Sequence, residues 1–268
     1  MSNGMVMPVL IFGVLFSLIW SSAFIAGKIS LEFMTPLGFL SFRFLSAGVL
    51  LLAVWLALQK RANLPTWHDK QLWQQGAILG VLNYVFYLGF SYTGLRTVSP
   101  ELVILIVAAT PFVVSILSFV VSRCVNYRQL AVIGLGFVGV YVALLPKLNN
   151  AAFGMGVLWV LAGVLAFAVG TLHYRHYAKS LHPLPLIGIQ NLSGGVILLP
   201  WLDYNALHAA MQDYAFIGSW LYQVVMISIV SMAMWFALVR RIGADLAAVF
   251  HLLNPSLVSC CLRYFLAR

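Results

Sequence analysis

Long apolar runs follow one another along the chain, with only short polar segments between them. A helix needs about 20 consecutive apolar residues to cross the hydrocarbon core of a membrane. Runs of this kind lie near 7–27, 36–58, 76–94, 100–121, 129–145, 154–174, 184–202, 216–238 and 244–266. The pattern therefore predicts nine membrane-spanning helices and an all-α polytopic membrane protein.

The composition agrees with this prediction. Of the 268 residues, 63% are hydrophobic and 8% are charged, and the mean hydropathy is +1.00. A net charge of +9 would suggest a nucleic-acid partner in a soluble protein, but here the cations occupy short loops, where they orient helices. If the spans alternate in direction, nine loop cations share the side of the N-terminus: Lys60, Arg61, Lys70, Arg123, Arg128, Arg175, Lys179, Arg240 and Arg241. Only Lys28, Arg96 and Lys147 lie opposite, so we expect a cytoplasmic N-terminus.

The chain repeats itself at an offset of 147 residues. Residues 36–52 (PLGFLSFRFLSAGVLLL) align with residues 183–199 (PLPLIGIQNLSGGVILL) at eight identical positions of seventeen. Shared leucine and valine alone would not also align a proline, a serine and a glycine, which indicates a duplication. Further along the chain the offset becomes 144, as a three-residue deletion in a loop would cause.

The duplication predicts two domains. The first is a five-helix repeat over residues 1–148, and the second is an incomplete repeat of four helices over residues 151–268. Because a full unit has an odd number of spans, the second copy enters the membrane from the opposite side. Inverted five-plus-five repeats are the plan of many secondary transporters, whose substrate site lies near the membrane midplane between the halves.

Four segments carry a resemblance to a known family: SLIWSSAFIAGK, FLSFRFLSAGVLLL, GLRTVSPELVILIVAATPFVVSIL and ALVRRIGADLAAVFHLLNPSLVS. In this order, and with the duplication, they resemble the EamA-type branch of the drug/metabolite transporter superfamily. The resemblance implies ten helices, cytoplasmic termini, export of small metabolites, and a cavity surrounded by the first four helices of each half. Residues 125–148 have no counterpart after the second copy, so we expect the tenth helix to be lacking.

Polar side chains within the apolar runs are candidates for a substrate cavity, because such groups are costly in lipid unless they face a cavity or a partner. Arg43 lies seven residues beyond Pro36, about 10 Å into its helix. Its repeat partner is Gln190, and a carboxylate-bearing substrate would suit this pair. The alternative is that Arg43 extends to the membrane interface. The other cavity candidates are Trp20, Asn83, Tyr84, Tyr87, Gln223, Ser231 and Trp235, each of which could instead hold helices together.

Three titratable residues are candidates for carrying a coupling proton. Glu101 and its repeat partner Asp245 lie at helix starts, where the helix dipole also stabilises an acid that has no other role. His251 lies just beyond Asp245 and is equally explained as an ordinary hydrogen-bonded histidine. Pro111 and Pro255 occupy equivalent mid-span positions, which predicts paired kinks that serve either gating or packing.

These features favour a secondary transporter that exports a small metabolite, such as an amino acid, across a bacterial inner membrane by alternating access. A membrane-embedded enzyme is less well supported, because all six acids lie at or outside span ends and the sequence holds no HExxH, GxSxG or Walker A motif. A lipid-carrier flippase of the same fold stays open. We expect a small-molecule substrate and membrane lipids as partners, with no nucleic acid, metal or cofactor, and the sequence leaves a homodimer open.

Overall fold

The computed structural model describes residues 3–61, 64–122 and 154–253, together with residues 131, 134, 135, 138, 139, 141 and 142. In this part of the chain, seven helices are long and apolar enough to cross a membrane: Pro8–Ser30, Pro36–Leu58, Lys70–Leu95, Pro100–Val120, Met155–Ala178, Pro183–Trp201 and Tyr214–Ile242. Each of them coincides with an apolar run of the sequence, which confirms the all-α polytopic membrane class. The predicted spans at 129–145 and 244–266 lie mostly outside the described residues, so the count of nine stays a prediction.

The first half of the chain forms the helices α1 (Asn3–Ser30), α2 (Pro36–Leu58), α3 (Lys70–Gly80), η1 (Val81–Leu88), α4 (Gly89–Leu95), α5 (Pro100–Ala108) and α6 (Thr110–Ser122). Proline in the first turn starts both α2 and α5, where its missing N–H has no helical partner to lose. Asp69 caps α3 by accepting a hydrogen bond from the Leu72 N–H at 3.2 Å. This carboxylate is therefore used to start a helix.

The second half forms α8 (Met155–His173), η2 (Tyr174–Ala178), α9 (Pro183–Leu198), η3 (Leu199–Trp201), α10 (Tyr204–Ala210), α11 (Tyr214–Tyr222), η4 (Gln223–Ser231), α12 (Met232–Ile242), α13 (Ala244–Val249) and η5 (Phe250–Leu253). Asp203 caps α10 and Asp213 caps α11, each through backbone N–H groups two and three residues further on. These two acids also serve as helix caps.

The third span of each half contains a π-helical segment. In the first half it is η1, between α3 and α4, and in the second half it is η4, between α11 and α12. Adding the repeat offset of 144 to the bounds of η1 gives residues 225–232, which overlap η4 almost completely. Because π-helical turns are frequently found at functional sites, these two segments indicate where to look for one.

Two glycine contacts between the halves are related to each other by the repeat offset of 147. A Cβ atom on Gly48 of α2 would lie 2.7 Å from the backbone nitrogen of Leu192, and one on Gly195 of α9 would lie 2.8 Å from that of Leu45. Adding 147 to Leu45 and Gly48 gives Leu192 and Gly195. The two contacts are thus copies of one contact, and only glycine permits the approach.

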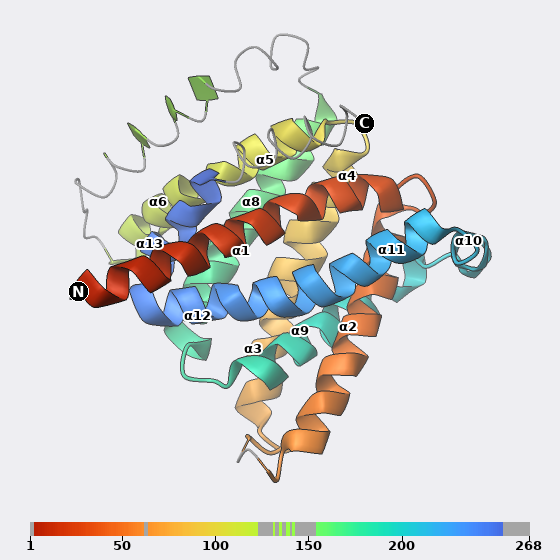
Figure 1. Ribbon diagram of the computed structural model, residues 1–268, viewed down its shortest axis with the longest axis horizontal. Helices are drawn as coiled ribbons and strands as arrows, with labels where there is room; N and C mark the ends of the chain where they lie inside the picture. Colours follow the sequence, from red (N-terminus) through yellow and green to blue (C-terminus); the bar gives the residue numbers. More distant parts are fainter. Residues whose placement is uncertain are drawn as a thin grey trace.

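The first helix of each half packs against the third span of the other half. α1 contacts α11, η4 and α12, whereas α8 contacts α4 and η1. Figure 1 shows α1, in red, running beside the blue helices α11 and α12. The two halves therefore interlock through their first and third spans.

The helix that carries Pro111 is interrupted at the predicted kink. α5 ends at Ala108 and α6 begins at Thr110, and the Ala109 N–H donates to the Ile106 carbonyl at 3.0 Å, a tighter turn than that of an α-helix. Pro255, the repeat partner of Pro111, lies outside the described residues.

Candidate substrate-binding site

Arg43 is held inside the protein at the contact between the two halves. The side chain is 1% exposed. Its Nε donates a hydrogen bond to Ser228 Oγ at 2.9 Å, and its Nη1 donates to Gln223 Oε1 at 2.9 Å and to the Tyr92 hydroxyl at 3.2 Å. Among the described residues, Nη2 has no hydrogen-bond partner. The guanidinium thus does not extend to the membrane interface and has donor capacity left.

A chain of polar groups continues from Arg43 into the second half. The Tyr92 hydroxyl donates to Gln223 Oε1 and lies 3.3 Å from the Ala23 carbonyl oxygen. Gln223 Nε2 donates to Ser30 Oγ at 3.2 Å, and this oxygen lies 2.8 Å from Ser219 Oγ. α1, α2, α4, α11 and η4 therefore meet at one hydrogen-bonded network.

The charge of Arg43 is not balanced by a carboxylate among the described side chains, since its hydrogen-bond partners are a serine, a tyrosine and a glutamine. Asp69, Asp203 and Asp213 are helix caps. Glu101 lies half-buried in the first turn of α5, after the capping residue Ser99. A buried charge without an opposite charge is costly, so the site is suited to receive an anion.

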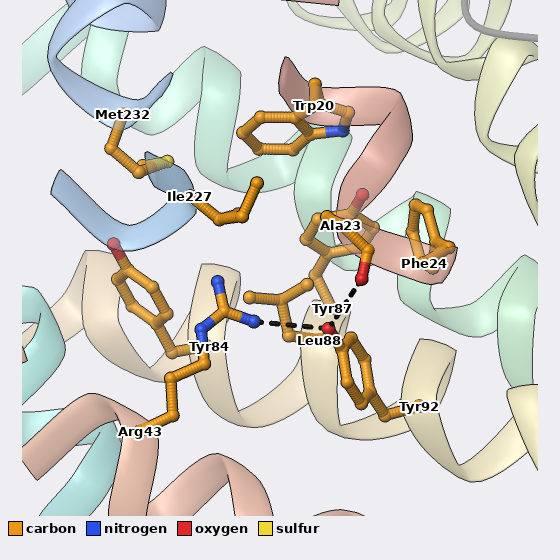
Figure 2. Close-up of a pocket in the computed structure, with 10 residues that line it drawn as sticks. All are labelled: Trp20, Ala23, Phe24, Arg43, Tyr84, Tyr87, Leu88, Tyr92, Ile227 and Met232. Carbon is orange, nitrogen blue, oxygen red and sulfur yellow. Dashed lines mark hydrogen bonds between the residues drawn. The ribbon is translucent and has the colours of Figure 1, made fainter. Parts of the chain in front are cut away.

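Arg43 borders a small cavity, which Figure 2 shows together with its lining. The cavity is lined by Trp20, Ala23, Phe24, Arg43, Tyr84, Tyr87, Leu88, Tyr92, Ile227 and Met232. Trp20 lies across the cavity from Arg43, and Tyr84 and Tyr92 flank the guanidinium. The volume of about 20 Å³ has room for about one water molecule. In this conformation the site is closed to a metabolite.

Aromatic rings from both halves pack beside the cavity. Trp20 and its repeat partner Phe167 stack with ring centroids 6.0 Å apart, and Tyr87 stacks on Phe167 at 4.5 Å. His251 is fully buried, and its ring lies 5.2 Å from Trp235 and 5.3 Å from Trp20. The structure thus brings the predicted residues Trp20, Tyr87, Trp235 and His251 into one cluster.

Asn83 and Gln190 form a second polar contact. Asn83 Nδ2 donates to Gln190 Oε1 at 3.3 Å, while Asn191 Nδ2 donates to the Tyr84 hydroxyl at 3.1 Å. Asn83 Oδ1 and Gln190 Nε2 are buried and have no hydrogen-bond partner in the described part of the chain. Gln190 makes no hydrogen bond with Arg43, which uses the amide of Gln223 instead.

Ser231 and Pro111 are not among the residues that line the cavity. Ser231 is buried, and its hydroxyl donates to the Ile227 carbonyl within η4, so its polar group is used inside its own helix. Asp245 lies in α13, but its side chain is outside the described part of the structure. Pro111 lies at the start of α6.

Tyr92 and Ser228 are site residues that the sequence analysis missed. Ser228 had a signal, because it is the repeat partner of Tyr84 at the offset of 144. Tyr92 had none of this kind, because its repeat partner is Phe236. Its role depends on the approach of η4, which brings Gln223 to its hydroxyl.

Comparisons with known proteins agree with a transporter fold. A family model described as the EamA-like transporter family matches residues 7–145 and again residues 154–268. An uncharacterized transporter of Archaeoglobus fulgidus is 27% identical over 237 residues, which cover 88% of this chain and 82% of that protein. The uncharacterized transporter YvbV of Bacillus subtilis is 25% identical over 245 residues, which cover 89% and 77% of the two chains.

Two further comparisons concern a longer relative and a solved structure. A WAT1-related chloroplastic protein of Arabidopsis thaliana is 27% identical over 206 residues, and the chain spans 47% of that protein's length. A crystal structure with 17% sequence identity matches with a TM-score of 0.66 and covers 96% of this chain and 88% of that one. This last similarity shows a shared fold.

Proposed function

Because the chain belongs to the EamA-like transporter family and is a membrane transporter, we propose that it is a secondary transporter that exports a small metabolite carrying a carboxylate, such as an amino acid. Export proceeds by alternating access between the two halves, across a bacterial inner membrane with the N-terminus in the cytoplasm. Its relatives are named as transporters and not as enzymes, which argues against the enzyme alternative.

The observation that carries this proposal is the buried charge of Arg43. A carboxylate that enters the cavity would accept hydrogen bonds from the N–H groups of Nη2, which has no partner among the described residues. Charge-assisted bonds between arginine and a carboxylate are roughly twice as strong as neutral ones and fix the orientation of the anion. A substrate bound in this way would also neutralise a charge that is costly inside a membrane.

The closed cavity supports the proposal of alternating access. A volume of about 20 Å³ holds about one water molecule, so a metabolite can bind only after helices separate on one side. The cavity is lined by α1, α2, η1 and α4 of the first half and by η4 and α12 of the second. A relative movement of the halves would therefore open it, as expected for inverted repeats that move around a central site.

The proposal is tested by transport in reconstituted vesicles. Proteoliposomes containing the full chain are loaded with a mixture of amino acids and other small carboxylates, and efflux is followed by mass spectrometry against protein-free vesicles. We expect efflux of at least one carboxylate, and that amides or esters of the same molecule are poor substrates. Equal efflux of the acid and its uncharged ester would contradict a carboxylate site. Efflux of no carboxylate, with active export of a lipid carrier, would favour the flippase.

A further inference from the structure

A groove lies beside the loop that joins α2 to α3, apart from the central cavity. It is lined by Leu52, Trp55, Leu56, Trp67 and Trp73 and has a volume of about 360 Å³, within the range of about 300 to 1,000 Å³ that is typical of ligand sites. Three of its five lining residues are tryptophans, which membrane proteins concentrate at the interface between lipid and water. The groove therefore lies where an α-helical span meets the headgroup region.

The walls of the groove are almost entirely apolar. Trp55 Nε1 donates to the Pro65 carbonyl at 3.0 Å, and Trp73 Nε1 donates to the Trp67 carbonyl at 2.8 Å. The N–H groups of these two indoles are thus used by the loop backbone. Trp55 is buried, whereas Trp67 and Trp73 are 55% and 38% exposed. Trp55 thus forms a fixed floor of the groove, and Trp67 and Trp73 form two exposed aromatic walls. A lining of this kind suits a hydrocarbon chain.

Cations continue the walls of the groove toward the helix ends. Lys60 follows Leu56 by four residues, and Gln59 between them keeps helical dihedral angles. Lys70 precedes Trp73 by three residues in the first turn of α3. Residues three apart share one helix face, so Lys70 lies on the face of α3 that carries Trp73, whereas Lys60 follows the end of α2, two residues after Leu58.

The loop end as a whole is positive. Lys60, Arg61 and Lys70 are exposed, and against these three cations stands Asp69, whose carboxylate caps α3. Three positive charges and one negative charge leave a net charge of +2 next to an apolar groove. Basic sites between helix ends are suited to the headgroups of anionic lipids.

We propose that this groove binds one acyl chain of an anionic phospholipid, with the headgroup phosphate held by Lys60 and Lys70. The lipid joins the end of α2 to the start of α3. These two helices lead to Arg43 and to η1 respectively, so the bound lipid stabilises the part of the fold that supports the central site.

The test uses native mass spectrometry of the full chain in detergent, titrated with phosphatidylglycerol or with phosphatidylcholine of identical acyl chains. We expect phosphatidylglycerol to bind about tenfold more tightly. The double variant Lys60→Gln/Lys70→Gln should lower its affinity about tenfold or more, and it should lower the affinity for phosphatidylcholine less, because the choline cation already balances the phosphate of that lipid. The matched control Arg96→Gln/Lys179→Gln removes two exposed cations that do not line this groove and should bind like the wild type.

A second variant tests the apolar wall. Trp67 is 55% exposed, so Trp67→Ala should unfold at the wild-type temperature while losing affinity for both lipids severalfold. The proposal is overturned if the two lipids bind equally well, if the control loses as much affinity as the lysine double variant, or if Trp67→Ala binds both lipids like the wild type.

Discussion

Arg43 carries a positive charge among neutral hydrogen-bond donors and acceptors. A substitution of Arg43 can therefore change transport without an equal change in the stability of the protein. A charge at depth costs about 2.5 to 3.5 kcal/mol on insertion scales. The hydrogen bonds to Ser228, Gln223 and Tyr92 offset part of that cost. Because no carboxylate among the described side chains depends on Arg43, its removal leaves no opposite charge stranded.

Arg43→Gln should therefore abolish binding of a carboxylate without unfolding the protein. We expect transport of the carboxylate substrate to fall at least tenfold and the unfolding temperature in detergent to stay equal or rise. Arg43→Lys should also lose transport, because an ammonium cannot reproduce the separate bonds of Nε and Nη1. The control is Arg96→Gln, at an exposed position. Normal transport by Arg43→Gln would show that the buried charge is structural.

Tyr92→Phe removes one hydroxyl that accepts from Arg43 and donates to Gln223. Leaving buried partners unsatisfied costs about 1 to 3 kcal/mol, so we expect a lower unfolding temperature and a raised KM for the carboxylate. The control Tyr214→Phe removes a hydroxyl from a side chain that is 91% exposed and should change neither quantity. If both variants behave alike, the Tyr92 hydroxyl does not hold Arg43 in place.

At the scale of helices, the two π-helical segments explain how the site is assembled. In an α-helix, residues five apart point about 140° away from each other, so Tyr87 and Tyr92 would lie on different faces. The π winding of η1 ends at Leu88, between them, and both tyrosines line the cavity. In the second half, η4 carries Gln223 and Ser228, which contact Arg43.

The glycine contacts between α2 and α9 predict that some glycine-to-alanine variants lower the stability of the protein and that others do not. At Gly48 an added methyl group would lie 2.7 Å from the Leu192 nitrogen, and such overpacking costs about 1 to 3 kcal/mol. We expect Gly48→Ala and Gly195→Ala to lower the unfolding temperature in detergent. Gly218→Ala is the control, because nothing lies within 4 Å of its added methyl group, and alanine favours a helix. Equal stability of all three variants would contradict the close packing of α2 on α9.

Hydropathy predicted the seven membrane helices of the described residues, because it depends on a pattern that runs along the chain. The partner of Arg43 was not predictable in this way. Gln223 lies 180 residues from Arg43, and its repeat partner is Leu79, so neither spacing nor symmetry indicates the contact. The π winding was equally hidden, since VLNYVFYL has the composition of any apolar helix.

At the scale of the whole molecule, the interlocked halves restrict how the cavity can open. α1 contacts the third span of the second half, and α8 contacts the third span of the first half. If one half moves relative to the other, α1 and α8 each move away from the span that they contact. The side on which the cavity opens first depends on the orientation in the membrane, which the loop charges predict.

The charge distribution predicts that the loop between α2 and α3 is cytoplasmic and that α10 is external. The first carries Lys60, Arg61 and Lys70, whereas residues 202–213, which include α10, contain no lysine or arginine.

Single cysteines at Thr66 and Asn205, both exposed, test this orientation after Cys124, Cys260 and Cys261 are replaced by serine. We expect an impermeant maleimide to label Asn205→Cys in intact cells, and Thr66→Cys only after the membrane is permeabilised. The permeabilised sample is also the control, because both cysteines should then react. Labelling of Thr66→Cys in intact cells would reverse the orientation, and with it the side from which the carboxylate reaches Arg43.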